Sequence, residues 1–151
     1  MNNSKFSILN SQLNYAALSA LDKSCVGSDG WSPDDFRSEA EKQGGIVLAA
    51  YDGESLAGLI AGFTAADTGE ILTVATAPRY RRQGAAKALL TEFLRLVPND
   101  VETIALEVRQ SNAAAIGLYK SFGFEKAGVR KRFYRDPVED ADIMVLTRTD
   151  R

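Results

Sequence analysis

The sequence contains no histidine and a single cysteine, Cys25, in 151 residues. Without imidazole there can be no Ser-His-Asp triad, no Cys-His pair and no histidine-ligated metal site. One cysteine forms no internal disulfide and supplies no zinc cage, so we expect a cytoplasmic protein without a bound metal. Any proton transfer must then use Glu, Asp, Lys, Tyr, Cys or water.

Long apolar runs and a strong charge imbalance are also missing. The longest apolar runs, near 46–51 and 56–63, are far shorter than the ~20 residues that cross a bilayer, and polar residues at 10–14 interrupt any signal-peptide core. The net charge is -2, and an isoelectric point near 5.2 argues against general nucleic-acid binding. With 45% apolar and 25% charged residues, the composition is typical of one globular domain over 1–151.

The spacing of apolar residues predicts alternating strands and helices. We expect helices over 11–22, from Ser32 to Gly44, over 84–97 and over 112–123. We expect strands over 5–9, 46–51, 55–63, 70–76, 103–108, 124–130 and 142–147. Loops are expected over 25–30, which contains Cys25, and over the charged segment between the last two strands. The order β-α-α-β-β-β-α-β-α-β-β, with a right-handed parallel crossover over 70–108, predicts a mixed α/β sheet with helices on both faces.

A basic loop joins the strand over 70–76 to the helix that begins at Gly84. Helix N-termini carry unpaired N–H groups and the positive end of the dipole, and small residues let the backbone approach a pyrophosphate closely. Three arginines and Lys87 add positive charge here. The spacing matches neither a Walker loop nor a dinucleotide fingerprint. A phosphate site and an ordinary helix start with solvated arginines are both open interpretations.

A carboxylate and a phenol follow in the second half of the chain. Glu107 lies on the strand expected beside the basic loop's strand, and Tyr119 lies two turns into the next helix. Brought together at strand ends, these groups can act as base and acid. The alternatives are an exposed strand carboxylate and a half-buried tyrosine, and Asn112 is most simply a helix N-cap.

The two segments together resemble the GNAT superfamily of acetyl-CoA-dependent N-acetyltransferases. The cofactor signature of that superfamily, R/Q-x-x-G-x-G/A, matches Arg81-Arg82-Gln83-Gly84-Ala85-Ala86. The RimI type, which acetylates the N-terminal alanine of a small-subunit ribosomal protein, is similar at Leu106-Glu107-Val108-Arg109, Ser111-Asn112, Leu118-Tyr119 and Gly123-Phe124. Its aromatic-serine helix start resembles Trp31-Ser32, and its C-terminal hairpin resembles Arg132-Phe133-Tyr134.

The resemblance implies a GNAT-like mixed seven-stranded sheet flanked by about four helices, with acetyl-CoA as cosubstrate. It implies Glu107 as general base and Tyr119 as general acid, with Trp31 and Tyr134 near the acceptor. Cys25, in the loop expected over 25–30, is far from these motifs in sequence. The thioester is expected in a gap between strands, near 74–76 and 105–107. The implied cofactor-binding residues are Val74, Ala75, Thr76, Arg81, Arg82, Gln83, Gly84, Ala85, Ala86, Lys87 and Asn112. Thr76 replaces a usual valine and Ala86 a common glycine, and both are small enough to keep these roles.

The function that follows is acetyl transfer to an amine, with the N-terminal alanine of a small-subunit ribosomal protein as the leading acceptor and no direct binding to membranes or nucleic acid. A small molecule, a lysine side chain or an aminoacyl-tRNA is an alternative acceptor, and the acidic isoelectric point disfavours the tRNA. A non-catalytic acetyl-CoA-binding module is a second alternative. A third is an assembly subunit that docks an acidic partner on the basic stretch 130–135, against a solvated loop there.

Overall fold

The computed structural model describes residues 5–148. The elements of that part of the chain are, in order, β1 (Ser7–Leu9), α1 (Tyr15–Val26), η1 (Gly27–Asp29), α2 (Pro33–Glu41), β2 (Gly45–Asp52), β3 (Ser55–Ala65), β4 (Thr68–Thr76), η2 (Pro78–Tyr80), α3 (Ala85–Leu96), β5 (Thr103–Arg109), α4 (Ala113–Ser121), β6 (Glu125–Arg135) and β7 (Val138–Thr147). The predicted order of strands and α-helices is confirmed. Within these residues, no helix is long and apolar enough to cross a membrane.

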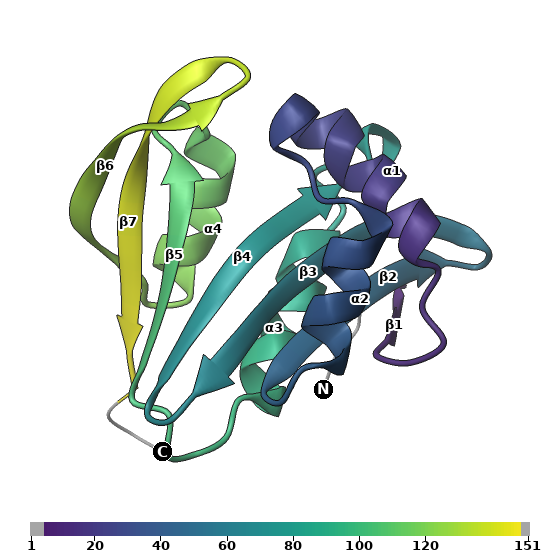
Figure 1. The fold of residues 1–151 in the computed structure, drawn as a ribbon, viewed down its shortest axis with the longest axis horizontal. Coiled ribbons are helices and arrows are strands. Elements are labelled where there is room, and N and C mark those ends of the chain that lie inside the picture. Colours follow the sequence, from purple (N-terminus) through teal and green to yellow (C-terminus); the bar gives the residue numbers. More distant parts are fainter. Residues whose placement is uncertain (1–4, 149–151) are drawn as a thin grey trace.

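The strands form one mixed seven-stranded sheet in the order β1-β2-β3-β4-β5-β7-β6. Neighbouring strands are antiparallel except β4 and β5, which are parallel and joined through α3 as predicted. Figure 1 shows α1 and α2 on one face of the sheet and α3 and α4 on the other. The predicted α/β class is therefore confirmed.

Two hydrophobic cores lie on the two faces of the sheet. On one face, Leu89 and Phe93 of α3 pack with Ile104 of β5, and all three are fully buried. On the other face, Leu18 of α1 and Phe36 of α2 pack against the central strands. Each such side chain contributes roughly 1.5–3 kcal/mol on burial, so both helical layers are fixed to the sheet by apolar contacts.

The face of the sheet covered by α1 and α2 is termed the acceptor face. Capping side chains determine where both of these helices begin. Ser32 Oγ accepts from Asp35 N at 3.0 Å and Asp35 Oδ2 accepts from Ser32 N at 2.9 Å, which makes a capping box at the predicted position. Asn14 caps α1 by accepting from Ala17 N, so this helix begins later than the predicted 11. The α1 helix also continues through Cys25 to Val26, where a loop was predicted.

The last two strands are longer than predicted. Instead of a charged loop, β6 runs to Arg135 and β7 begins at Val138, with only a short turn between them. One cross-strand ion pair lies in this extension, where Lys131 Nζ is 3.6 Å from Asp140 Oδ2. A second joins Lys126 Nζ and Asp142 Oδ1 at 3.3 Å within the predicted strands. The pairing of β6 with β7 is irregular between Arg130 and Tyr134, so the charged segment forms an exposed hairpin that contains a bulge.

The sheet splits between β4 and β5. These strands pair only from Thr68–Ile71 to Thr103–Leu106, and beyond them the arrowheads diverge in Figure 1. The register between β3 and β4 shifts at the same place, because Ile71 and Thr73 oppose consecutive residues of β3 and leave Leu72 as an extra residue. A bulge of this kind bends a strand and disrupts its pairing. The gap was predicted near 74–76 and 105–107, but 105 and 106 are still paired, so on β5 it begins at Glu107.

Candidate active site

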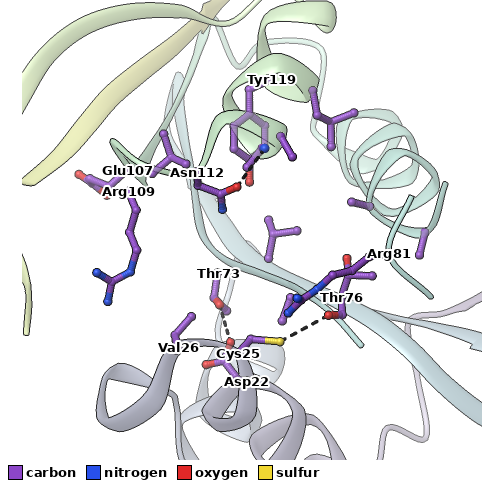
Figure 2. Close-up of a pocket in the computed structure, with 18 of the residues that line it drawn as sticks. Asp22, Cys25, Val26, Thr73, Thr76, Arg81, Glu107, Arg109, Asn112 and Tyr119 are labelled. Atoms are coloured by element: carbon purple, nitrogen blue, oxygen red, sulfur yellow. Dashed lines mark hydrogen bonds between the residues drawn. The ribbon is translucent and has the colours of Figure 1, made fainter. Parts of the chain in front are cut away.

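A cavity of about 960 Å³ opens between the diverging ends of β4 and β5. Figure 2 shows that its walls come from α1, β4, β5, α4 and the segment before α3. The sequence-predicted residues on its lining are Trp31, Val74, Ala75, Thr76, Arg81, Arg82, Gly84, Ala85, Ala86, Lys87, Glu107, Asn112, Tyr119 and Tyr134. Residues from six separate segments are thus brought together at one place.

Strand alternation separates the two sides of this cavity. Ile104, Leu106 and Val108 belong to the core shared with α3, so Glu107 and Arg109 project to the acceptor face. Tyr119 of α4 belongs to the opposite layer, which we call the cofactor face. A ligand that enters from the cofactor face therefore meets Tyr119, and one that enters from the acceptor face meets Glu107.

The cofactor face presents the start of α3. No side chain caps this helix, and its first residues follow Arg82 and Gly84, which have φ of 64° and 92°. A Cβ added to Gly84 would meet no atom within 4 Å, so the backbone here borders open space. Uncapped N–H groups beside Arg81 and Arg82 fit a pyrophosphate group. The left-handed conformation of a non-glycine residue is typical of ligand-clamping turns.

Gln83 is placed differently from its prediction. It does not line the cavity; its side chain accepts from Lys5 Nζ and donates to Arg79 O, each at 2.7 Å. Tyr80 anchors the same turn by donating to Asp52 Oδ2 at 3.0 Å. The Gln83 side chain therefore braces the turn from behind. The resemblance could not predict this, because one partner, Lys5, lies before β1 and far from the motif in sequence.

Tyr119 and Asn112 both come from the α4 region. Asn112 accepts from Ala115 N at 3.2 Å, which confirms the predicted N-cap of α4. Asn112 also lines the cavity. Tyr119 is 6% exposed and packs against Phe124. Burial, with a smaller contribution from Tyr134, raises the pKa of Tyr119 well above its ordinary value. Its phenol therefore holds its proton at neutral pH.

Glu107 and Tyr134 lie on the acceptor face. Glu107 Oε2 accepts from Arg130 Nε at 2.9 Å, and the carboxylate side chain remains 21% exposed. Burial raises the pKa of Tyr134 to about 12, with Arg109 opposing the shift and nearby carboxylates adding to it. Trp31 packs on Phe36 at the same side. These residues could contact an acceptor, and Arg130 is already engaged in an ion pair within the protein.

Arg109 joins the segments around the acceptor side, a role that the motif alone does not reveal. Its guanidinium donates to the carbonyl oxygens of Asp136 and Pro137, at 3.0 and 2.9 Å, and pairs with Asp29 and Glu139. It also lies 4.3 Å from the Tyr134 ring centroid. One side chain thus fastens η1 and the β6–β7 turn to β5.

Cys25, Asp22 and Thr73 form the α1 side of the cavity. Cys25 was predicted in a loop far from the motifs, but its Sγ lies on α1, 3.4 Å from Thr76 O, as a donor. Asp22 and Thr73 are bonded to each other and line the same wall (Figure 2). No sequence motif pointed to these residues, because they meet only when α1 packs on β4.

The sequence is similar to known acetyltransferases. The acetyltransferase (GNAT) family model matches residues 15–124. The N-alpha-acetyltransferase RimI of Mycobacterium tuberculosis is 35% identical over 127 residues, 82% of this chain and 78% of that protein. The [ribosomal protein bS18]-alanine N-acetyltransferase of Escherichia coli K12 is 46% identical over 83 residues, 53% of this chain and 56% of that protein. The match to this relative therefore spans little more than half of its length.

The fold is similar as well. The crystal structure of the ribosomal-protein-S18-alanine N-acetyltransferase from Escherichia coli aligns with a TM-score of 0.80 and 31% identity. The alignment covers 94% of this chain and 93% of that one. The family model, the sequence relatives and the fold agree with one another. The chain belongs to the acetyltransferase (GNAT) family.

Proposed function

We propose that this protein transfers the acetyl group of acetyl-CoA to the N-terminal alanine of a small-subunit ribosomal protein. The observation that carries the proposal is the cavity at the β4–β5 split, which has an uncapped helix start on one face and a carboxylate on the other. The acceptor is suggested by the similarity to the ribosomal protein bS18-alanine N-acetyltransferase of Escherichia coli. We place the reaction in the cytoplasm.

The charge of the cofactor face suits acetyl-CoA. Its pyrophosphate would accept hydrogen bonds from the N–H groups at the start of α3 and would pair with Arg81, Arg82 and Lys87. Its pantetheine arm would run along Val74–Thr76, towards the gap in the sheet. Tyr119 and Asn112 would lie on its other side. The thioester then reaches the gap, where the two faces of the sheet communicate.

The transfer needs one base and one acid. The acceptor amine attacks the thioester carbonyl carbon, and Glu107 accepts a proton from the amine, directly or through water. The C–S bond breaks, and the departing thiolate takes the proton of Tyr119. Because base and acid lie on opposite faces, each faces the substrate atom that needs it. No covalent enzyme intermediate forms, so Cys25 is not a nucleophile here.

An α-amine is the acceptor that suits this pair. The pKa of an α-amine is near 7.7–8.0 and that of a lysine amine near 10.4, so about 10–20% of the former and about 0.04% of the latter is neutral at pH 7. The difference is worth about 3.5 kcal/mol. A carboxylate base with no histidine beside it can supply the smaller free energy that deprotonation of an α-amine requires.

The test is a panel of peptides assayed by thiol release. The panel contains N-termini of Ala, Ser and Met, and a lysine peptide whose own N-terminus is blocked. We expect the Ala peptide, built on the start of ribosomal protein S18, to have the highest kcat/KM. Acetylation of only the lysine peptide would refute the acceptor. Tight acetyl-CoA binding without turnover on any amine would favour a non-catalytic module.

A further inference from the structure

Thr73 lies where β4 turns away from β5. It is the second residue after the last parallel pair at Ile71, and the extra residue Leu72 directs it to the acceptor face. There its hydroxyl meets Asp22 of α1, and both residues line the cavity. Figure 2 shows Thr73 and Glu107 on either side of this cavity, one from each of the two diverging strands.

The hydrogen bonds of Asp22 fix the direction of the Thr73 hydroxyl. Asp22 is 1% exposed, and its Oδ2 accepts from Trp31 N at 2.8 Å. Its Oδ1 accepts from Thr73 Oγ1 at 2.6 Å. Burial raises the pKa of Asp22, while the bonds from Thr73 and Trp31 oppose this shift. Both carboxyl oxygens of Asp22 therefore act as acceptors, and the single hydroxyl proton of Thr73 is directed to Asp22 Oδ1.

A hydroxyl whose single proton is donated to one partner can form further hydrogen bonds only as an acceptor. The remaining lone pairs of Thr73 Oγ1 are therefore complementary to an N–H donor in the cavity. Glu107, on the facing strand, is also an acceptor. A neutral primary amine carries two N–H groups and one lone pair, so it can donate to both side chains while its lone pair points at the thioester.

We infer that Thr73 is a substrate-contacting residue that accepts an N–H of the acceptor amine, and that Asp22 is the positioning residue that keeps the Thr73 hydroxyl in that role. The inference rests on the proposed function in requiring an amine acceptor, and it does not depend on which amine. It makes the site selective for primary amines, because a secondary amine or an alcohol has too few protons to satisfy both acceptors.

The experiment compares Thr73→Val, which keeps the shape and removes the hydroxyl, with Thr73→Ser, which keeps the hydroxyl. Two matched peptides begin with alanine and with N-methylalanine. We expect Thr73→Val to lower kcat/KM for the alanine peptide at least fivefold, with acetyl-CoA affinity within twofold of the wild type. The preference for the primary amine should fall at least threefold. Thr73→Ser should stay within about twofold of the wild type.

Two further variants separate this role from a merely structural one. Thr68→Val makes the same change on the same strand outside the cavity, where the hydroxyl donates to Ala65 O, and it should leave both peptides unaffected. Asp22→Asn keeps an acceptor for Trp31 N but offers an N–H to Thr73, so the hydroxyl no longer has to donate to residue 22. This variant should lose amine selectivity as Thr73→Val does, while still binding acetyl-CoA.

The inference would be overturned if Thr73→Val left the ratio of kcat/KM between the alanine and N-methylalanine peptides unchanged. It would also be overturned if Thr73→Val and Thr73→Ser lost kcat/KM equally and in proportion to a fall in Tm. If the wild type acetylates lysine or a small amine instead of N-terminal peptides, the proposed acceptor fails. The Thr73 series, repeated on that amine and its N-methyl form, then decides the inference separately. Absence of turnover on every amine would overturn both.

Discussion

Glu107 and Tyr119 reach the same gap from opposite faces of one sheet. The two residues are close in sequence, but β5 directs one side chain to the acceptor face and the following helix returns the other to the cofactor face. Water access differs accordingly, since Glu107 is 21% exposed on its side chain and Tyr119 is buried. A base that meets solvent and an acid that keeps its proton fit the two halves of the proposed transfer.

Removal of either group should slow the chemical step. We predict that Glu107→Gln and Tyr119→Phe each lower kcat at least tenfold while acetyl-CoA still binds, because general acid–base catalysis commonly supplies about 10²–10⁴-fold. Steady-state kinetics and calorimetry measure the two effects. Glu92→Gln, which breaks another Glu–Arg pair on the α3 surface, is the control and should be neutral. Wild-type turnover by either site variant would exclude its role.

The pKa of Tyr134 predicts a pH effect on stability. Because the folded protein raises this pKa from 10.0 to about 12, folding favours the protonated phenol. Its contribution to stability is complete below pH 10 and is lost as the pH rises from 10 towards 12. Denaturant midpoints across this range should fall less steeply in Tyr134→Phe than in the wild type. Equal slopes would contradict the shift.

At this scale, the sequence predicts cavity-lining residues that stand within a short motif, but not those that only packing brings together. Glu107, Tyr119 and the Gly84 turn stand in short, ordered strings. Asp22 and Thr73 are 51 positions apart and meet across α1 and β4. Cys25 was misplaced for the same reason, because its helix continues two residues beyond the expected loop boundary.

At the scale of elements, the turn before α3 contains two residues with positive φ, Arg82 and Gly84. Gly84 has φ of 92°, and its missing Cβ faces open space. We predict that Gly84→Trp abolishes acetyl-CoA binding by calorimetry, because the indole would fill the space that a pyrophosphate needs. Gly53→Trp is a matched control: it also has positive φ and open space, but it lies outside the cavity in the β2–β3 turn. Equal acetyl-CoA affinity in both variants would place the phosphates elsewhere.

The turn of the β6–β7 hairpin is held by Arg109 of β5 together with Ser28 and Asp29 of η1. We predict that Arg109→Met frees the hairpin turn, since the guanidinium bonds its carbonyls at Asp136 and Pro137. Trypsin should cleave the basic segment 130–135 at least severalfold faster, and KM for the acceptor peptide should rise. The acetyl-CoA KM should not change. Arg95→Met, which removes an exposed arginine of α3, controls for loss of charge. Unchanged proteolysis would show that other contacts suffice.

Element order was predictable from apolar periodicity and from turn residues, because these patterns are local. The lengths of β6 and β7 were not, because charged residues in a strand are stabilised by partners on its neighbour. Lys131 and Asp140 indicate a loop when each is considered alone, but their side chains form an ion pair across the hairpin. The start of the gap was also missed, since a bulge depends on the register of two strands.

For the whole molecule, the split sheet predicts how a ligand affects stability. Only four residue pairs connect β4 to β5, so the two halves of the sheet share a narrow seam. Acetyl-CoA would contact α3 on one half and Asn112 on the other. At 100 times its Kd it should add about 2.7 kcal/mol of stability and raise Tm by roughly 5–10 °C. Inorganic pyrophosphate would contact only the α3 half and so bind more weakly, and at the same concentration as acetyl-CoA it should raise Tm less when compared by calorimetry. Equal shifts would contradict a bridging ligand.

Leu72 has a consequence for how the chain can vary. In a regular strand, residues 71 and 73 would share a face, but the extra position changes the parity, so Ile71 enters the core and Thr73 meets Asp22. A deletion or insertion at this point would exchange every following side chain between the two faces. Substitutions can therefore change the side chains on the acceptor face, whereas the number of residues from Ile71 to Pro78 must stay fixed. The length of this strand is itself a component of the site.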